Sequence, residues 1–482
     1  MTNLISTGRR LNSNGIRLAL GILVGLPILL WAVWQIGRDT LKPLAFGIAG
    51  LAVLIVLMRR DSKRMILMAA FGGVVLGWRG FEISPGLRVF PSELFVWLGV
   101  LNYLSSKLTH GRDSTQLGLP MASLLLAFVS LVGLGVAATN LNSMTDAVVE
   151  AKAFIIFFPI LVLLRSWVRS VEDVSLYVRV LVVCGTIIAA LGLLERFFPS
   201  VGEIAPWFFT NPTEMRVNVR GTDMILLSGF SSWGGTIVAV ILVPCVALSA
   251  ALQKQRVGAK RTIWIVSEVV LVAGIVVSGY RSSWLGLITV FAVLFTIYRS
   301  SFFLYVAGAA TAVYFLPAEY SDRFNTILLL SKSGDSSMVT RASAIERGLQ
   351  SVWDNPLSGT GWGSQTVFND WLYLAIALGL PALAIFAFWY FSLLGRLWRR
   401  IGFTDFPAQS YSRHLMIGFL AGLAGYGVCM VSGAMSQVPP LMVSFWLIFC
   451  LGERLVRLEA TAGAPTALME RYSQPLTSHV SN

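Results

Sequence analysis

Long apolar runs recur along the whole chain and are separated by short polar segments. A window of about 19 residues, the length that crosses a bilayer as a helix, finds them repeatedly. The runs are 16–36, 41–58, 65–78, 90–104, 117–138, 148–164, 174–194, 233–252, 262–279, 283–298, 302–317, 368–394, 414–431 and 439–451. Four of them are short for a bilayer. The pattern predicts an all-α, polytopic transmembrane helical bundle of about 12–14 spans.

The polar segments divide the chain into four parts. Residues 1–317 are expected to form a membrane bundle of about 11 spans, with an outer loop at 195–232. Residues 318–367 form a large outer-face loop with short helices, and 368–452 carry the C-terminal spans. Residues 453–482 form a cytoplasmic tail that we expect to be disordered.

One helix is predicted within the large outer loop, over residues 338–353. Its apolar residues recur at spacings of three and four and so share one face. They are Met338, Ala342, Ile345, Leu349 and Val352. Arg341 and Glu346 fall on opposite flanks of this stripe, whereas Arg347 points to water. Arg341 and Glu346 are therefore the better candidates for a site, although solvated surface charges would follow the same pattern.

Composition and charge agree with a membrane protein. Apolar residues make up 56% of the 482 residues, charged residues 13%, and the net charge is +13. If the N-terminus is cytoplasmic, 24 of the 37 Lys and Arg residues lie in inside segments. The positive charge then follows the positive-inside rule, which places both termini in the cytoplasm and excludes a nucleic-acid surface.

The cysteines indicate neither a disulfide framework nor a metal site. Each lies inside an apolar run, without His or carboxylate neighbours at ligand spacing. They are Cys184, Cys245, Cys429 and Cys450. We therefore expect core packing for the thiols, no metal and no cofactor.

Arg281 lies in a very short hairpin between the runs 262–279 and 283–298. A guanidinium near hydrocarbon is costly unless it is paired, and its planar fork suits phosphate oxygens. Arg281 is therefore a candidate anion-binding residue, while the alternative is a side chain that snorkels to lipid headgroups. Glu268, inside the first of these runs, is either an ion site of a transporter or a carboxyl group bonded to a neighbouring helix.

Residues 356–363 form a Gly-rich turn that superficially resembles a phosphate-binding loop. It follows a predicted helix instead of a strand, and it has no Gly-Lys-Ser/Thr sequence, so a nucleotide site is not indicated. The alternative interpretation is a tight turn whose main-chain N–H groups approach a substrate phosphate.

Several short motifs between residues 216 and 391 resemble the O-antigen ligase and polysaccharide polymerase family of bacterial envelopes. The similar segments are Arg220 ahead of Gly229-Phe230, the Ser-Gly-Tyr-Arg of 278–281, Arg341, the Pro-x-x-Gly-x-Gly of 356–361, the Asn-Asp-Trp-Leu-Tyr-Leu of 369–374 and the Leu-Gly-Leu-Pro of 378–381. The spans before residue 216 fit this family in number and polarity only.

The resemblance implies a glycosyltransferase of the bacterial inner membrane that acts in exopolysaccharide or lipopolysaccharide biosynthesis. Such an enzyme moves a glycan from undecaprenyl diphosphate to an acceptor hydroxyl at the periplasmic face, without metal or nucleotide. Arg220, Arg281 and Arg341 would then bind the diphosphate, with Gly359, Gly361 and Asn369 in the substrate loop. Cationic groups of this kind stabilise a departing diphosphate.

The chain departs from the family motif at Phe368, where the family has His before Asn. The remaining histidines fall on the cytoplasmic side of the expected topology, so Asp370 and Glu346 become the candidate general bases. Weak activation of the acceptor, or loss of activity, are the alternatives. Because the His is missing, we favour a polymerase over an O-antigen ligase that acts on lipid A core. The rival from another class is a transporter, in which Glu268 is functional and Arg281 structural.

Overall fold

The computed structural model of the chain describes residues 62–76, 81–84, 87–110, 119–140, 142–198, 216–219, 222–225, 235–254, 259–298, 336–364, 367, 369–403, 411–433 and 438–462. The chain divides into two compact units, Met1–Met65 and Ile66–Asn482. Of the first unit only residues 62–65 are described, as helix. All contacts described here lie within the second unit.

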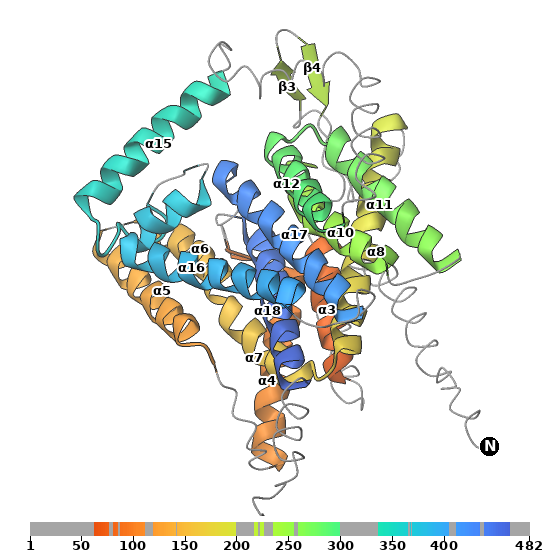
Figure 1. Cartoon of the computed structure of the whole chain (residues 1–482). Coiled ribbons are helices and arrows are strands. Elements are labelled where there is room, and N and C mark those ends of the chain that lie inside the picture. Colours follow the sequence, from red (N-terminus) through yellow and green to blue (C-terminus); the bar gives the residue numbers. More distant parts are fainter. Residues whose placement is uncertain are drawn as a thin grey trace, which may run out of the picture. The chain divides into compact units, whose positions relative to one another are not determined.

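The described part of the chain is built almost entirely from helices (Figure 1). They are α3 (Ser62–Leu76), α4 (Pro91–His110), α5 (Met121–Thr139), α6 (Met144–Ile155), α7 (Phe157–Trp167), α8 (Val171–Phe197), α10 (Gly235–Lys254), α11 (Ala259–Val277), α12 (Arg281–Tyr298), α15 (Ser336–Asp354), α16 (Asp370–Phe403), α17 (Tyr411–Ser432) and α18 (Pro439–Ala462).

Six stretches of described helix are long and apolar enough to cross a membrane. They are Met121–Thr139, Met144–Trp167, Val171–Leu194, Arg281–Tyr298, Asp370–Gly402 and Tyr411–Val431. Shorter apolar stretches lie in α4 and α10. The protein is thus a multi-pass membrane protein, and the predicted all-α, polytopic helical bundle is confirmed. The expected runs 16–36, 41–58 and 302–317 fall outside the described residues.

Small residues let the central helices approach closely. A Cβ added to Gly286 of α12 would lie 2.9 Å from the carbonyl oxygen of Gly425 on α17. A Cβ on Gly422 of α17 would lie 3.2 Å from the Cα of Pro244 on α10. Such contacts are typical of membrane helix pairs. Helix α17 therefore forms the centre of the bundle, with α10, α12, α16 and α18 packed against it (Figure 1).

Aromatic side chains fill the core between α6, α7, α16 and α18. The ring centroids of Phe157 and Trp446 are 4.9 Å apart, and Trp389 stacks on Trp446 at 5.9 Å. Phe154, Phe157 and Trp446 are fully buried. Because lipid tails are as apolar as these rings, their contribution to stability comes from close packing and not from the removal of water.

Helix α16 is interrupted at Gly379, whose φ is 83° and ψ is 170°. The sequence predicted one continuous span over 368–394. The structure differs because Pro381 has no N–H to donate and Gly379 readily adopts a positive φ. The N–H of Leu380 donates to the carbonyl oxygen of Pro356, outside the helix, at 2.8 Å. The break leaves helical carbonyl groups that need donors from another segment.

Two short antiparallel hairpins also occur, although the sequence analysis predicted no strands. One pairs β1 (Phe81–Ser84) with β2 (Leu87–Val89). The other pairs β3 (Arg216–Val219) with β4 (Thr222–Ile225), inside the polar stretch 195–232. The second hairpin has a two-residue connection, the shortest that joins antiparallel strands.

Helix α15 confirms the predicted helix over 338–353, and its apolar stripe is not the face that packs on the bundle. Ile345 and Leu349 of the apolar stripe are 37% and 57% exposed. The packed face instead contains Ala344, which is 4% exposed, and Gly348. A Cβ on Gly348 would lie 2.8 Å from the Cδ1 of Ile376, so the small residues let α15 approach α16. Small residues, and not the apolar stripe, therefore form the contact of this helix with α16.

Candidate functional site

A tight turn between α11 and α12 carries Arg281. The turn contains Gly279, with φ 67°, and α12 begins at Arg281 itself. The Oγ of Ser278 donates to the carbonyl oxygen of Ile275 at 2.6 Å and accepts from the N–H of Tyr280 at 3.2 Å. The indole Nε1 of Trp284 donates to the same carbonyl at 3.0 Å. The turn is therefore held rigidly, with Arg281 half-buried at the start of the next helix.

Tyr280, directly before Arg281, marks the point where three elements meet. Burial raises the pKa of its phenol, whereas a hydrogen bond with Ser282 and the charge of Arg341 lower it. The Asp370 carboxylate acts in the same direction as burial. Arg341 comes from α15 and Asp370 from α16, so charges of opposite sign from two further helices act on this phenol.

Asp370 is fully buried at the first position of α16. A carboxylate at a helix N-terminus is stabilised by the partial positive charge of that end. Asn369 immediately before it caps the helix, because its Oδ1 accepts from the N–H of Leu372 at 3.0 Å. The structure therefore gives Asn369 a role in fixing where α16, and with it Asp370, begins. Its predicted contact with substrate stays a prediction.

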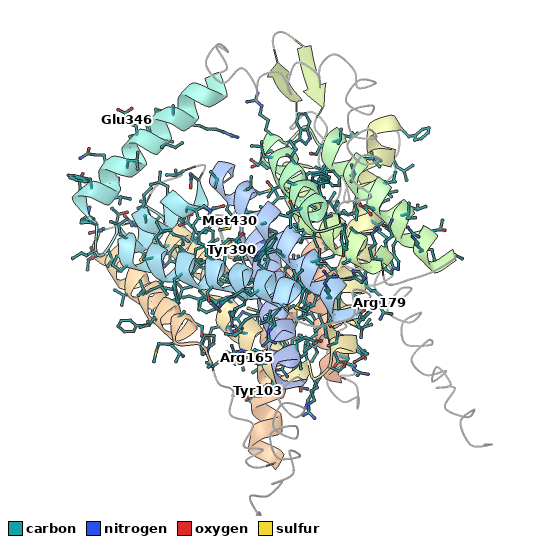
Figure 2. All side chains as sticks on the ribbon, in the orientation of Figure 1. Tyr103, Arg165, Arg179, Glu346, Tyr390 and Met430 are labelled. Atoms are coloured by element: carbon teal, nitrogen blue, oxygen red, sulfur yellow. The ribbon has the colours of Figure 1, made fainter. Side chains whose placement is uncertain are left out.

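Arg341 and Glu346 separate on α15. Arg341 is half-buried. It lies about two helical turns before Gly348 and therefore on the side of α15 that packs against α16. Glu346 is exposed, and Figure 2 shows it on the side of α15 turned away from the other helices. Of the two predicted charged residues on this helix, the structure therefore brings only Arg341 towards Tyr280 and Asp370.

The Gly-rich turn fills the break in α16. The N–H of Thr360 donates to the carbonyl oxygen of Ile376 at 2.7 Å, and the N–H of Gly361 donates to that of Ala377 at 3.0 Å. The N–H of Gly359 donates to Asn355 at 3.1 Å. These three N–H groups thus bond protein carbonyls, two of them freed by the helix break. The predicted approach of Gly359 and Gly361 to a substrate stays a prediction, and their scaffold role is shown.

The same turn is clamped on its other side by α5 and the residues that follow it. The side-chain amides of Asn140 and Asn142 each donate to the carbonyl oxygen of Thr360 at 3.0 Å. The indole of Trp362 is fully buried and donates to the carbonyl oxygen of Ser130 at 3.0 Å. Gly361 has φ 84°, and a Cβ there would collide with the main chain of Ala137. Only glycine fits this position.

Glu150 and Tyr373 were not identified from the sequence. The Oε2 of Glu150 accepts the N–H of Gly363 at 2.7 Å and a short hydrogen bond from the Tyr373 hydroxyl. Tyr373 follows Asp370 by one turn of α16 and interacts with it electrostatically. The signal that could have found Glu150 is a carboxylate within the apolar run 148–164, the same signal that singled out Glu268.

Glu268 has a charged neighbour in the structure. It is 2% exposed and sits on the inward side of α11, whereas Val266 and Val269 are 55% and 61% exposed. Lys254, at the end of α10, interacts electrostatically with Glu268. A buried carboxylate with a lysine in electrostatic range is compatible with a structural role, and the two interpretations made from the sequence both stay predictions.

Two sequence-predicted positions lie outside the described residues. These are Arg220, in the connection between β3 and β4, and Phe368, just before Asn369. Within the described ranges, no three His, Cys, Asp or Glu side chains gather as metal ligands would. The four thiols are unbridged.

The sequence matches no protein-family model, and no curated protein matches it. The similarity of the motifs in 216–391 to the O-antigen ligase and polysaccharide polymerase family therefore stays a prediction.

Proposed function

We propose that this protein is a glycosyltransferase of the bacterial inner membrane. It moves a glycan from an undecaprenyl-diphosphate donor to an acceptor hydroxyl at the periplasmic face, as a polysaccharide, O-antigen or exopolysaccharide polymerase. The observation that supports this most is the packing of α15, which carries Arg341, on the first turns of α16, which begins at the buried Asp370. Both charges also act on the Tyr280 hydroxyl, directly before Arg281. A cation and a carboxylate are the groups that glycosyl transfer from a diphosphate requires.

The two arginines of the described site have the chemistry of diphosphate binding. Each guanidinium can bind phosphate oxygens through two parallel N–H bonds, and each charge-assisted bond contributes about 1.5–3 kcal/mol. Negative charge grows on the bridging oxygen as the glycosidic bond to phosphate breaks. Arg281 and Arg341 would stabilise that charge, with Arg220 as a further candidate. No nucleotide is required, because the lipid diphosphate is already activated.

Asp370 is the candidate base of this proposal, because its charge and that of Arg341 both act on the Tyr280 hydroxyl. It is fully buried, so an acceptor hydroxyl reaches it only when a covering element moves. Helix α15 is that candidate cover, because it packs on the first turns of α16 through Gly348. Donor binding through Arg341 would then be coupled to access to Asp370.

The test compares arginines on one helix. Purified protein would receive an undecaprenyl-diphosphate glycan, and lengthened lipid-linked glycan would be measured by gel or mass spectrometry. Arg341→Ala should lower turnover about 10²-fold or more, as expected for a lost oxyanion stabiliser. Arg347→Ala removes the same charge from the exposed face of α15 and should retain activity. Equal effects of both changes, or no effect of either, would refute the assignment of Arg341.

Transfer to lipid A core, the O-antigen ligase reaction, is the alternative within the same chemistry. The donor and the arginines would be the same, and only the acceptor would differ. Supplying lipid A core and a second lipid-linked repeat as competing acceptors distinguishes ligase from polymerase, since the product carries the acceptor used.

A transporter is the alternative from another class, and Glu268 is the observation that bears on it. Interrupted helices at the membrane midplane form ion and substrate sites in many transporters. Here the carbonyl groups freed by the break in α16 accept from Thr360 and Gly361, so they already have donors. Comparing Glu268→Gln with Arg281→Ala by glycan chain-length profile separates the classes. Loss with Glu268→Gln alone would favour transport.

A further inference from the structure

A cluster of arginines surrounds one buried carboxylate near the end of α16 opposite to Asp370. The Oε1 of Glu453 on α18 accepts from the Nη2 of Arg165 at 2.7 Å and from the Nε of Arg457 at 3.3 Å. The side chains of Arg165 and Glu453 are 3% and 1% exposed. Arg165 lies where α7 and α18 run side by side (Figure 2). Arg165 and Glu453 thus form a buried ion pair, to which Arg457 adds a more exposed contact.

Two further arginines lie in electrostatic range of the same carboxylate. Arg396 on α16 and Arg454 on α18 both interact electrostatically with Glu453 and with Arg457. Both are half-buried, unlike Arg165. Four guanidinium groups therefore lie in range of a single carboxylate. The cluster keeps a surplus of positive charge that Glu453 does not balance.

The main chain offsets little of this surplus. The Nε of Arg454 donates to the carbonyl oxygen of Val168, which caps α7, at 2.8 Å, and Arg165 lies in the last turn of α7. The C-terminal end of one helix is equivalent to about half a negative charge. The Nε of Arg396 bonds the carbonyl oxygen of Ser392 at 3.3 Å. A guanidinium has five N–H donors, so one main-chain bond each leaves most of the capacity of Arg396 and Arg454.

The cluster sits at a membrane boundary. Arg165 and Arg396 fall in the last residues of the spans Met144–Trp167 and Asp370–Gly402. Cations at that depth are costly unless an anion pairs with them. Basic groups gathered between helices at a membrane surface fit the phosphate of an acidic lipid, which supplies charge and acceptor oxygens together.

We propose that Arg396 and Arg454, backed by the Arg457–Glu453–Arg165 ion pairs, form a binding site for the headgroup phosphate of an anionic phospholipid. The lipid tails would lie along the apolar ends of α16 and α18. Glu453 holds the arginines in place, and the phosphate binds on the side of Arg396 and Arg454 away from it. This site is independent of the proposed glycosyl transfer.

The test measures lipid retention by the full-length protein. Native mass spectrometry of the purified protein would follow titration with phosphatidylglycerol, cardiolipin or phosphatidylcholine. The wild type should retain the anionic lipids at least about tenfold more tightly than phosphatidylcholine, since each of the two interfacial arginines contributes roughly a fivefold factor. Arg396→Gln with Arg454→Gln should remove most of this preference. No preference in the wild type would overturn the proposal.

Matched controls separate a defined site from diffuse charge. Arg399→Gln with Arg400→Gln removes two charges from the same end of α16, and Arg399 is exposed. This pair should lower retention clearly less than the Arg396 and Arg454 pair does, and an equal loss in both pairs would overturn the proposal. Glycerol phosphate that displaces the lipid at equal concentration would indicate a free-anion site instead and would also overturn it.

A wild-type measurement covers the case in which the double variant fails to fold. A phosphatidylglycerol analogue with a photoreactive headgroup should label peptides from the ends of α16 and α18. Labelling confined to other helices would contradict the proposed position.

Discussion

The main-chain N–H of Thr360 donates to the carbonyl oxygen of Ile376 at 2.7 Å. This bond joins a polar connection to the interior of a membrane-spanning helix, at the turn that Gly379 interrupts. With the bond from Gly361 to Ala377, it makes Thr360 and Gly361 a substitute for the missing helical donors. The connection is therefore part of the bundle's structure.

The first prediction concerns that connection. Gly361→Ala should destabilise the protein by about 1–3 kcal/mol or more, because the residue has a positive φ and its Cβ would meet the main chain of Ala137. Gly395→Ala is the matched control. A Cβ at Gly395, also on α16, meets nothing within 4 Å. That change should be neutral or stabilising by roughly 0.5–1 kcal/mol. Thermal unfolding in detergent checks both, and equal melting temperatures would contradict the prediction.

The second prediction concerns Arg281. Arg281→Lys should lose most of the transfer activity, because lysine keeps the charge but not the two parallel N–H bonds of guanidinium. Arg281→Ala should lose at least as much. The assay uses a lipid-diphosphate glycan donor, with thermal unfolding to show that each variant is folded. Full activity of the lysine variant would mean that only the charge at this turn is used.

The third prediction separates the two candidate bases. Asp370→Asn should lower turnover by about 10²–10⁴-fold, the range for a lost general base. Glu346→Gln should have a much smaller effect, since Glu346 is exposed and turned away from Tyr280 and Asp370. Single-turnover rates at saturating donor give the comparison. Full activity in both variants would leave stabilisation of the leaving diphosphate as the whole mechanism.

The fourth prediction concerns orientation in the membrane. Asn355→Cys, at the exposed end of α15, should react with an impermeant thiol reagent in cells whose inner membrane is intact. Gly402→Cys, exposed near the end of α16, should react only after permeabilisation. The expectation rests on the excess of Lys and Arg in the segments assigned to the cytoplasm. The reverse pattern would place the site on the cytoplasmic side.

The length of the apolar runs predicted the class of fold, but it could not predict which faces of the helices pack together. The helix over 338–353 was found, but its rotation was not. Gly348 contributes little to an apolar pattern, yet it sets the contact with α16. The interruption in the span 368–394 was missed for a similar reason. Pro381 alone does not break a membrane helix, and the donors that make the break possible come from Thr360 and Gly361.

The residues of the candidate site, too, could be predicted from the sequence only in part. Arg341 and Asp370 could be singled out by residue type and motif, and the structure brings both to Tyr280. Glu346 had equal standing in the sequence, because both flanks of a helix look alike until its neighbour is known. Glu150 was overlooked because its partners, Gly363 and Tyr373, are far from it in sequence.

The clamp on Thr360 sets an order of events during synthesis. Asn140 and Asn142 bond a carbonyl group 220 and 218 residues further along the chain. When α5 and α6 enter the membrane, the segment that completes their contacts has not yet been made. Contacts so distant in sequence form slowly, since a long loop must close first. The side-chain amides of Asn140 and Asn142 therefore stay hydrated until α16 has been inserted. A chain that stops before residue 356 can have several of its spans in the membrane and still lack its native packing at this face.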